Sequence, residues 1–169
     1  FQKTIAYKYG AETPFDRPKK LADDKTPTLP VLQHAIRYLE EEEGYRSDIV
    51  LLLYPTAPFL KAKRIEEALD LFEKKKCNSV ISVVSDWGRF WRFDENKIKY
   101  EPFYPKKRVN RQYYNPLFRE DGAIYFSTYE VLMKKNKLVD DSNIEFVIMD
   151  EGDNVDIDTF GGALCAVLH

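Results

Sequence analysis

Two aspartates separated by one residue, Asp156 and Asp158, are the residues whose type and spacing most suggest a chemical role. In an extended segment, side chains at positions i and i+2 point to the same side, so both carboxylates can converge on one cation. Magnesium is usually held by one or two carboxylates, with water and substrate phosphates completing its octahedron. The spacing therefore predicts a Mg²⁺ site. The alternative interpretation is that Asp158 caps a helix beginning near Thr159.

Arg17 and two threonines suit a ligand that carries phosphate groups. Arg17 precedes Pro18 in a loop rich in turn-forming residues, where a guanidinium can hold a phosphate or a base through two hydrogen bonds. Thr26 and Thr28 stand where a helix is expected to begin, and hydroxyls with free backbone N–H groups suit a nucleotide there. The plain alternatives are a surface arginine and threonines that only cap the helix.

A proline-stiffened turn at residues 54–58 (YPTAP) follows an expected buried strand. Ligands of open α/β sheets bind beyond the carboxyl ends of strands, so Tyr54 and this turn are candidates for a pocket wall. The alternative is that the prolines only end the strand. Farther along, Arg111 and Arg119 lie in an aromatic stretch, where they could meet an acidic substrate or lie over aromatic faces.

Hydrophobic spacing predicts the elements that hold these residues. Residues 48–54 form an apolar run without alternation, and residues 79–84 are a second candidate for a strand covered on both faces. The segment between them predicts an amphipathic helix. Its expected inward residues are Ile65, Ala68, Leu69 and Phe72. Strand, helix and strand in about 35 residues match a βαβ unit, so we expect a largely parallel sheet.

The remaining elements extend this α/β core on both sides. The first residues have the pattern of a helix that ends at Gly10, and a second helix is expected from Thr26 or Thr28 to Gly44. Further elements are predicted as a strand at 122–127, a short helix at 128–135, a strand at 144–149 and a terminal helix from near Thr159.

Residues 86–121 differ from the rest of the chain because they are aromatic and basic and show no helical period. We interpret them as short strands that form a flap or dimerisation arm, the alternative being a large loop packed through its aromatic side chains. The expected organisation is a partial nucleotide-binding core at 1–85, this arm at 86–121, and a return to the core at 122–169.

Composition narrows the class of protein. The 169 residues include 26 Lys and Arg against 28 Asp and Glu, a net charge of −2, and without a basic block this argues against nucleic-acid binding. Hydrophobic residues make up 44%, enough for one sizeable core. Cys77 and Cys165 lie too far apart to suggest a disulfide framework or a zinc site. The longest apolar run, 49–53, is too short to span a membrane, so we expect a cytoplasmic protein.

Several motifs, taken in their order and spacing, resemble the acylneuraminate (sialic acid) cytidylyltransferases, a family that also activates other nonulosonic acids. The resemblance covers nearly the whole chain. It is carried by residues 9–18 (YGAETPFDRP), 21–24 (LADD), Thr28, 34–36 (HAI), 52–58 (LLYPTAP), 79–83 (SVISV), 111–112 (RQ), 118–125 (FREDGAIY) and 155–159 (VDIDT).

The resemblance implies a doubly wound, mostly parallel sheet of the nucleotide-diphospho-sugar transferase, or glycosyltransferase-A-like, type. It also implies transfer of CMP from CTP to the anomeric hydroxyl of an acidic nine-carbon sugar, with release of pyrophosphate. Arg17 and Thr28 would contact the nucleotide, and Asp156 and Asp158 would hold Mg²⁺. Tyr54 and Arg111 would lie near the sugar, while Arg119 and the aromatic arm would help to form a homodimer.

Three features depart from the family pattern. The family opens with a strand and a phosphate loop containing glycine and lysine, and this sequence is expected to begin after them. Tyr54 replaces the glutamine of sialic acid enzymes, a variant associated with relatives acting on pseudaminic or other modified nonulosonic acids. Asp121 replaces an asparagine before Gly122, and Gly161 and Gly162 replace the acidic stretch that follows the aspartate pair in the family. Two other interpretations therefore stay open: a non-catalytic or truncated remnant of the fold, and a glycosyltransferase that uses a finished nucleotide sugar.

Overall fold

The computed structural model describes residues 2–23, 25–103, 109–153 and 157. The predicted metal ligands Asp156 and Asp158, and the helix expected from near Thr159, lie outside the described residues. None of the described helices combines the length and apolar character needed to cross a bilayer.

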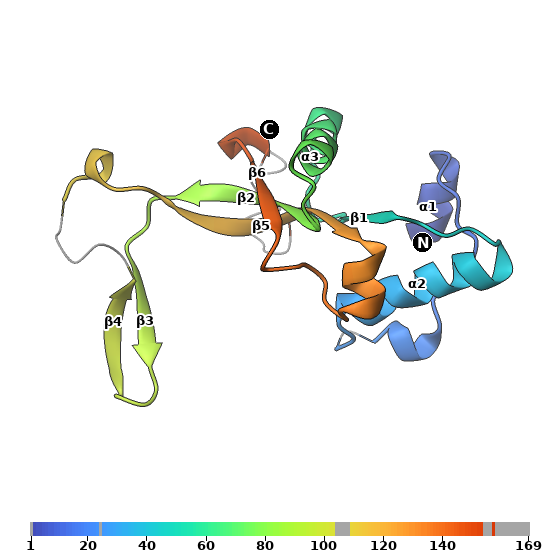
Figure 1. Cartoon of the computed structure of the whole chain (residues 1–169), viewed down its shortest axis with the longest axis horizontal. Coiled ribbons are helices and arrows are strands. Elements are labelled where there is room, and N and C mark those ends of the chain that lie inside the picture. The colour runs from blue at the N-terminus through green and yellow to red at the C-terminus, as the bar shows by residue number, and fades with distance from the viewer. Residues whose placement is uncertain (1, 24, 104–108, 154–156, 158–169) are drawn as a thin grey trace.

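A four-stranded mixed sheet forms the centre of the molecule (Figure 1). Its spatial order is β1 (Ile49–Leu53), β5 (Leu117–Thr128), β2 (Ser79–Asp86) and β6 (Ile144–Ile148). β5 pairs antiparallel with both β1 and β2, whereas β2 and β6 pair in parallel. It follows that β1, β2 and β6 run in one direction and β5 runs against them.

The expectation of a largely parallel sheet is therefore wrong for the strand pairing. The crossover from β1 through α3 (Ala62–Lys75) to β2 does give two strands of the same direction. Such a unit sets the relative direction of its two strands but does not make them neighbours in the sheet, and here β5 lies between them. Local hydrophobic spacing carries no information about this insertion, because β5 comes from more than 30 residues farther along the chain.

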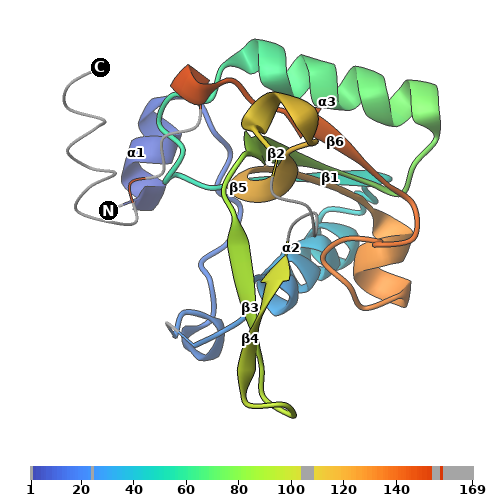
Figure 2. The same cartoon turned by 90° about the vertical axis from the view of Figure 1, so that its left-hand side faces the viewer.

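The long helices lie on opposite sides of the sheet, as expected for a doubly wound arrangement (Figures 1 and 2). α3 packs on β2, β5 and β6, burying Ala68 completely. Leu69, predicted to face inward, is 40% exposed, and Leu71 packs on the core instead. On the other side, α2 (Thr28–Glu42) is tied to the short helix η3 (Glu130–Lys134), where the Gln33 amide donates to the Leu132 carbonyl at 2.7 Å.

β2 is the most deeply buried strand, with every residue from 79 to 84 buried. This explains why its sequence lacks polar alternation, since both of its faces are covered. The core gathers around its apolar side chains and those of its neighbours. It includes Val80, Val84, Ala123, Ile124, Phe126, Val147 and Met149.

β5 begins five residues before the predicted start at Gly122. Gly122 adopts φ +77°, in the left-handed region that favours glycine, and the β2–β5 register shifts between Ile81 and Val83. Ser82 fills the irregularity, since its hydroxyl donates to the Asp121 carboxylate and accepts from the Ile124 N–H. The glycine therefore marks a bulge inside one long strand and not the start of a strand.

The aromatic stretch contains the short strands that its sequence predicts. β3 (Phe90–Asp94) and β4 (Lys99–Phe103) pair with each other in a separate two-stranded sheet. This hairpin projects away from the main sheet in both views (Figures 1 and 2). A short helix, η2 (Arg111–Tyr113), lies on the return to β5.

Smaller elements complete the described chain. α1 (Gln2–Lys8) ends before Gly10, as predicted, and Gly10 has φ +85°. η1 (Lys19–Leu21) precedes α2, and η4 (Glu151–Asp153) follows β6. α2 begins at Thr28 after Pro27, and no side chain caps its first turn. Capping by Thr26 or Thr28 is therefore not what the structure shows.

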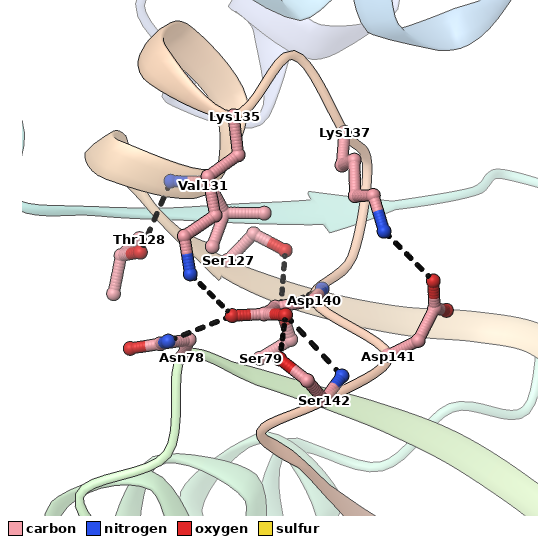
Figure 3. A network of polar contacts seen from close by, with 10 residues as sticks. All are labelled: Asn78, Ser79, Ser127, Thr128, Val131, Lys135, Lys137, Asp140, Asp141 and Ser142. Carbon is pink, nitrogen blue, oxygen red and sulfur yellow. Dashed lines mark hydrogen bonds and ion pairs between the residues drawn. The ribbon is translucent and has the colours of Figure 1, made fainter.

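The amino-terminal end of β2 is closed by a polar network (Figure 3). The buried Asp140 carboxylate accepts hydrogen bonds from Lys135 Nζ at 2.7 Å, Asn78 Nδ2 at 2.8 Å and Ser142 Oγ at 2.7 Å. The ammonium group of Lys135, followed by the Ser142 and Asn78 donors, holds the pKa of Asp140 far below its usual range. Asp140 is therefore an ionised acceptor at neutral pH.

Two serines extend this network into the sheet. The Ser79 hydroxyl accepts from the Asp140 N–H at 2.9 Å and lies 3.2 Å from the Ser127 hydroxyl. Ser127 donates to the Leu138 carbonyl at 2.6 Å. The network thus joins β2, β5 and the loop before β6 through groups that are bonded to one another.

Candidate functional site

The ends of β1, β2 and β6 face the same way because these three strands run in one direction. We call this the carboxyl edge: residues 54–58 after β1, residues 84–88 at the end of β2, and residues 149–153 after β6. Ligands of open α/β sheets bind beyond such strand ends. Four of the predicted site residues come together in two pairs at or beside this edge.

Thr28 and Tyr54 are joined directly. The Thr28 hydroxyl at the start of α2 lies 2.7 Å from the Tyr54 hydroxyl after β1. These residues lie 26 positions apart in the sequence. The family resemblance assigns Thr28 to the nucleotide and Tyr54 to the sugar. Since Thr28 does not cap its helix, its hydroxyl is used to orient Tyr54.

Tyr125 continues this group of hydroxyls and was not predicted from the sequence. Its ring meets that of Tyr54 edge to face at 5.9 Å, and its hydroxyl donates to Glu120 Oε2 at 3.0 Å. Burial, followed by the hydrogen bond to Glu120, raises the pKa of Tyr125 above its usual range. Tyr125 therefore stays a neutral donor at physiological pH. It lies five residues after Glu120 in the same strand motif, a spacing that would not predict this pairing on a regular strand.

Arg111 and Arg119 line one hollow at the end of β2. Its other lining residues are Val84, Ser85, Asp86, Trp87, Gly88 and Met149. The Arg111 guanidinium lies 4.7 Å over the Trp87 ring, and Arg119 Nε lies 3.8 Å from the Asp86 carboxylate. Stacking on an indole leaves the in-plane N–H groups of a guanidinium available to a planar anion.

The wall around Trp87 is held by local contacts. The Tyr114 hydroxyl donates to the Trp87 carbonyl at 2.7 Å, and the two rings meet edge to face at 5.8 Å. Gly88 donates its N–H to Asp86 Oδ1 at 2.7 Å, and a Cβ atom on Gly88 would lie 2.9 Å from that same oxygen. A side chain at position 88 would therefore force the Asp86 carboxylate or the Phe90 ring to shift. Asp86 and Trp87 were not among the predicted site residues, although an acidic and an aromatic residue at the end of a buried strand were a usable signal.

Arg17 lies apart from both groups. It is exposed, in a separate hollow lined by Lys3, Glu12, Thr13, Pro14, Phe15, Asp16 and Ala22. Phe15 holds this loop against α2, with ring contacts to His34 at 5.2 Å and Tyr38 at 4.9 Å. Thr28 lines yet another hollow, with Pro27, Leu29 and residues 136–139 and 141. The structure does not join Arg17 to Thr28.

The predicted metal ligands flank a residue that the structure does describe. Ile157, between Asp156 and Asp158 in sequence, donates its N–H to the Thr56 carbonyl at 3.0 Å. This position of the chain therefore lies against the turn at the end of β1. Within residues 2–23, 25–103, 109–153 and 157, no three His, Cys, Asp or Glu side chains gather in a way that could hold a metal ion.

Comparison with known proteins identifies relatives, although no family model matches the chain. A CMP-N,N′-diacetyllegionaminic acid synthase of Legionella pneumophila is 26% identical over 160 residues, covering 92% of this chain and 67% of that protein. A pseudaminic acid cytidylyltransferase of Campylobacter jejuni is 26% identical over 147 residues, 85% of this chain and 63% of its own length. An N-acylneuraminate cytidylyltransferase of Escherichia coli is 27% identical over 91% of this chain and 36% of its own length. The chain thus spans about two thirds or less of these relatives.

The fold has a counterpart among solved structures. The crystal structure of 4-diphosphocytidyl-2C-methyl-D-erythritol synthase from Anaerococcus prevotii matches with a TM-score of 0.65 at 16% identity, over 99% of this chain and 75% of that one. At this identity the match speaks for the fold alone. Together with the sequence relatives, it makes the chain a distant homologue of the CMP-legionaminic, pseudaminic and N-acylneuraminate cytidylyltransferases, with a nucleotidyltransferase fold.

Proposed function

We propose that this chain forms the core of a cytidylyltransferase that transfers CMP from CTP to a nonulosonic acid. The observation that carries the proposal is the similarity to a CMP-sugar synthase over 92% of the chain. The geometry of the carboxyl edge supports it, because hydroxyl and guanidinium groups from distant parts of the sequence gather beside the strand ends.

The hollow at the end of β2 fits the acidic sugar. Arg111 and Arg119 supply positive charge, while Trp87 offers a flat apolar face for the carbon skeleton. A guanidinium binds a carboxylate through two parallel hydrogen bonds. We assign Arg111 to the sugar carboxylate because Arg119 already faces Asp86 at 3.8 Å.

The nucleotide is assigned to the side of the edge nearer α2. Thr28 offers a hydroxyl at the first turn of a 15-residue helix, whose N-terminal end favours negative charge. Tyr54, bonded to Thr28, lies between this position and the strand ends and is assigned to the sugar. Arg17 belongs to the proposal only as a more distant nucleotide contact, since it lies in a separate hollow.

Asp156 and Asp158 are proposed to hold Mg²⁺, and two carboxylates are a donor set that this hard cation accepts. The backbone bond between Ile157 and Thr56 supports a site beside the end of β1. When bound, the cation would neutralise charge on the triphosphate and on the departing pyrophosphate.

The reaction itself is a displacement at phosphorus. The anomeric hydroxyl of the sugar attacks the α-phosphorus of CTP, the bond to the bridging oxygen of the β-phosphate breaks, and pyrophosphate leaves. Such a step depends on in-line positioning more than on covalent help from the protein. The proposed contribution of this chain is therefore to hold the sugar carboxylate at Arg111 and the nucleotide near Thr28.

A homodimer is part of the proposal. The hairpin of β3 and β4 leaves a set of aromatic side chains at least 40% exposed, namely Phe90, Trp91, Phe93, Tyr100 and Phe103. Exposed apolar patches of this kind commonly mark protein–protein contacts. Light scattering at micromolar concentration should give twice the mass of the protein, and a monomeric mass would contradict this part of the proposal.

The function is tested by pyrophosphate release from the protein that carries this chain. We expect release with CTP, Mg²⁺ and one member of a panel of nonulosonic acids, and none with GTP. Asp156→Asn and Asp158→Asn should each lower the rate at least a hundredfold. Asp70→Asn, which changes an exposed carboxylate on α3, is the matched control. Full activity in both Asp156 and Asp158 variants would overturn the metal assignment, and cleavage of a CMP-sugar without use of CTP would favour a glycosyltransferase.

A further inference from the structure

The segment that carries Arg111 is attached to the turn after β2 through Trp87. Tyr114, the residue after η2, donates its hydroxyl to the Trp87 carbonyl at 2.7 Å, and the two rings meet edge to face at 5.8 Å. The Arg111 guanidinium lies 4.7 Å over the ring of the same tryptophan. Two residues of one short segment therefore contact Trp87, one over its ring and the other at its backbone carbonyl.

A second arginine holds this segment from the start of the hairpin. Arg89, directly before β3, donates from Nη2 to the Val109 carbonyl and lies 5.4 Å over the Tyr114 ring. These two contacts join residues on either side of η2. The short helix is thus held at both ends by residues of the turn between β2 and β3.

The contact between Tyr114 and Trp87 is also the more sheltered part of this arrangement. Both residues are half-buried, whereas Arg111 is exposed. An exposed arginine samples many rotamers, so a ligand that binds it must first order it unless the surface on which it lies is already fixed. The bond from Tyr114 restrains the tryptophan, and the tryptophan is the surface on which the Arg111 guanidinium lies.

We propose that Tyr114 is a positioning residue: its hydroxyl holds the Trp87 indole and thereby holds the Arg111 guanidinium in place for the sugar carboxylate. This inference rests on the proposed function, which assigns Arg111 to that carboxylate. Tyr114 is not among the described residues that line the hollow, so it acts through Trp87 and Arg111. Its effect is on the affinity for the sugar and not on the chemical step.

The test is the steady-state kinetics of Tyr114→Phe, which removes the hydroxyl and keeps the ring. With the nonulosonic acid that supports pyrophosphate release, KM for the sugar should rise about fivefold because one partly buried hydrogen bond is lost. The kcat and the KM for CTP should stay unchanged. Tyr113→Phe, which removes the hydroxyl of an exposed tyrosine one residue away, is the matched control and should change none of these constants.

A double-mutant cycle shows whether Tyr114 acts through Arg111. In an Arg111→Ala background the hydroxyl has no guanidinium to position, so adding Tyr114→Phe should change KM for the sugar by less than about twofold. A fivefold effect that persists in this background would overturn the positioning role, because Tyr114 would then act without Arg111.

The indole can also be followed with no substrate present. The 169 residues contain two tryptophans, and Trp91→Phe leaves Trp87 as the fluorescent one. In that background Tyr114→Phe should increase the quenching of Trp87 fluorescence by acrylamide, because a restraint on the indole is lost, and Tyr113→Phe should not. Equal quenching in the two variants would contradict the proposal. If Tyr114→Phe does not fold, Arg89→Gln takes its place, because Arg89 is exposed and holds the same segment.

The outcomes separate this inference from the function on which it rests. A raised KM for the sugar in Arg111→Ala, with an unchanged KM in Tyr114→Phe, would overturn the role of Tyr114 and leave the sugar assignment standing. An unchanged KM in Arg111→Ala would remove Arg111 from the sugar site and, with it, the positioning role.

Discussion

The two ends of β2 use polar side chains in opposite ways. At its amino end, Asn78 and Ser79 are bonded into the network around Asp140, whose side chain is 5% exposed. At its carboxyl end, Arg111 and Arg119 line a hollow with Trp87 and have more of their surface in solvent. One strand therefore joins a closed end, the Asp140 network, to the open carboxyl edge.

The two ends of β2 differ in how many polar groups remain available to a ligand. At the closed end, the polar atoms are hydrogen-bonded to one another, so the network stabilises the fold and offers few free groups to a ligand. At the open end, the Arg111 guanidinium stacks on the Trp87 ring, which leaves its in-plane N–H groups available to an anion. Polar substitutions should accordingly change stability at one end and function at the other.

The largest expected effect is loss of stability at the closed end. Asp140→Ala removes the acceptor of four hydrogen bonds, counting the Ser142 N–H at 3.2 Å, and should lower Tm by about 10 °C. Asp141→Ala is the matched control, because the neighbouring Asp141 is exposed and pairs only with Lys137 at 3.2 Å in the described structure. A scanning calorimetry trace showing equal shifts in the two variants would contradict the structural role of Asp140.

The next effect is functional and belongs to the open end. Arg111→Ala should raise KM for the sugar about thirtyfold, because a charged pair of hydrogen bonds is lost, while Tm changes by less than about 2 °C. Arg92→Ala on the hairpin serves as control, since Arg92 is 68% exposed and makes only a 3.8 Å pair with Glu101 among the contacts described. Steady-state kinetics that give both variants the same KM would remove Arg111 from the sugar site.

Lowering the pH should reduce the stability that the Asp140 carboxylate gives to the fold. The Asp140 pKa is lowered on folding, so its stabilisation is complete above the unfolded value of about 3.9 and is lost as pH falls toward the folded pKa. Urea unfolding from pH 6 to pH 2.5 should therefore show the gap in stability between wild type and Asp140→Asn shrinking below about pH 4. A gap that is constant across this range would show that Asp140 is not ionised in the way the network requires.

The smallest expected effect is at the hydroxyl pair. Tyr54→Phe removes one hydrogen bond and should raise KM for the sugar about fivefold. Tyr45→Phe is the control, because Tyr45 is an exposed tyrosine. Thr28→Val should have a similar effect. Because each substitution breaks the same 2.7 Å contact, the loss in the double variant should be smaller than the sum of the two single losses, and fully additive losses would show that this contact does not couple the two hydroxyls.

Much of the fold was predictable because it follows from local hydrophobic spacing. The spans of β1, α3 and β2 match the predicted strands and helix to within a few residues. The insertion of β5 was not predictable, because a βαβ pattern specifies strand direction and leaves neighbours open. The continuation of β5 through Gly122 was missed since a glycine at φ +77° is a bulge here and a turn signal elsewhere.

The candidate site was predictable in its residue types more than in its geometry. Tyr54 was singled out from its place after a strand, but its partner Thr28 depends on how α2 meets the sheet. Arg111 and Arg119 were identified together and do share a hollow, whereas Arg17 lies in another. Contacts across such separations arise from tertiary packing, which one sequence does not encode locally.

Hydrogen exchange with and without CTP and the best nonulosonic acid tests the central claim most directly. We expect slower amide exchange at residues 54–58 and 84–88 of the carboxyl edge, with no change at residues 142–146, which belong to the closed end and do not line the hollow beside Thr28. Protection at residues 142–146, or none at the carboxyl edge while calorimetry shows both ligands bound, would contradict this expectation.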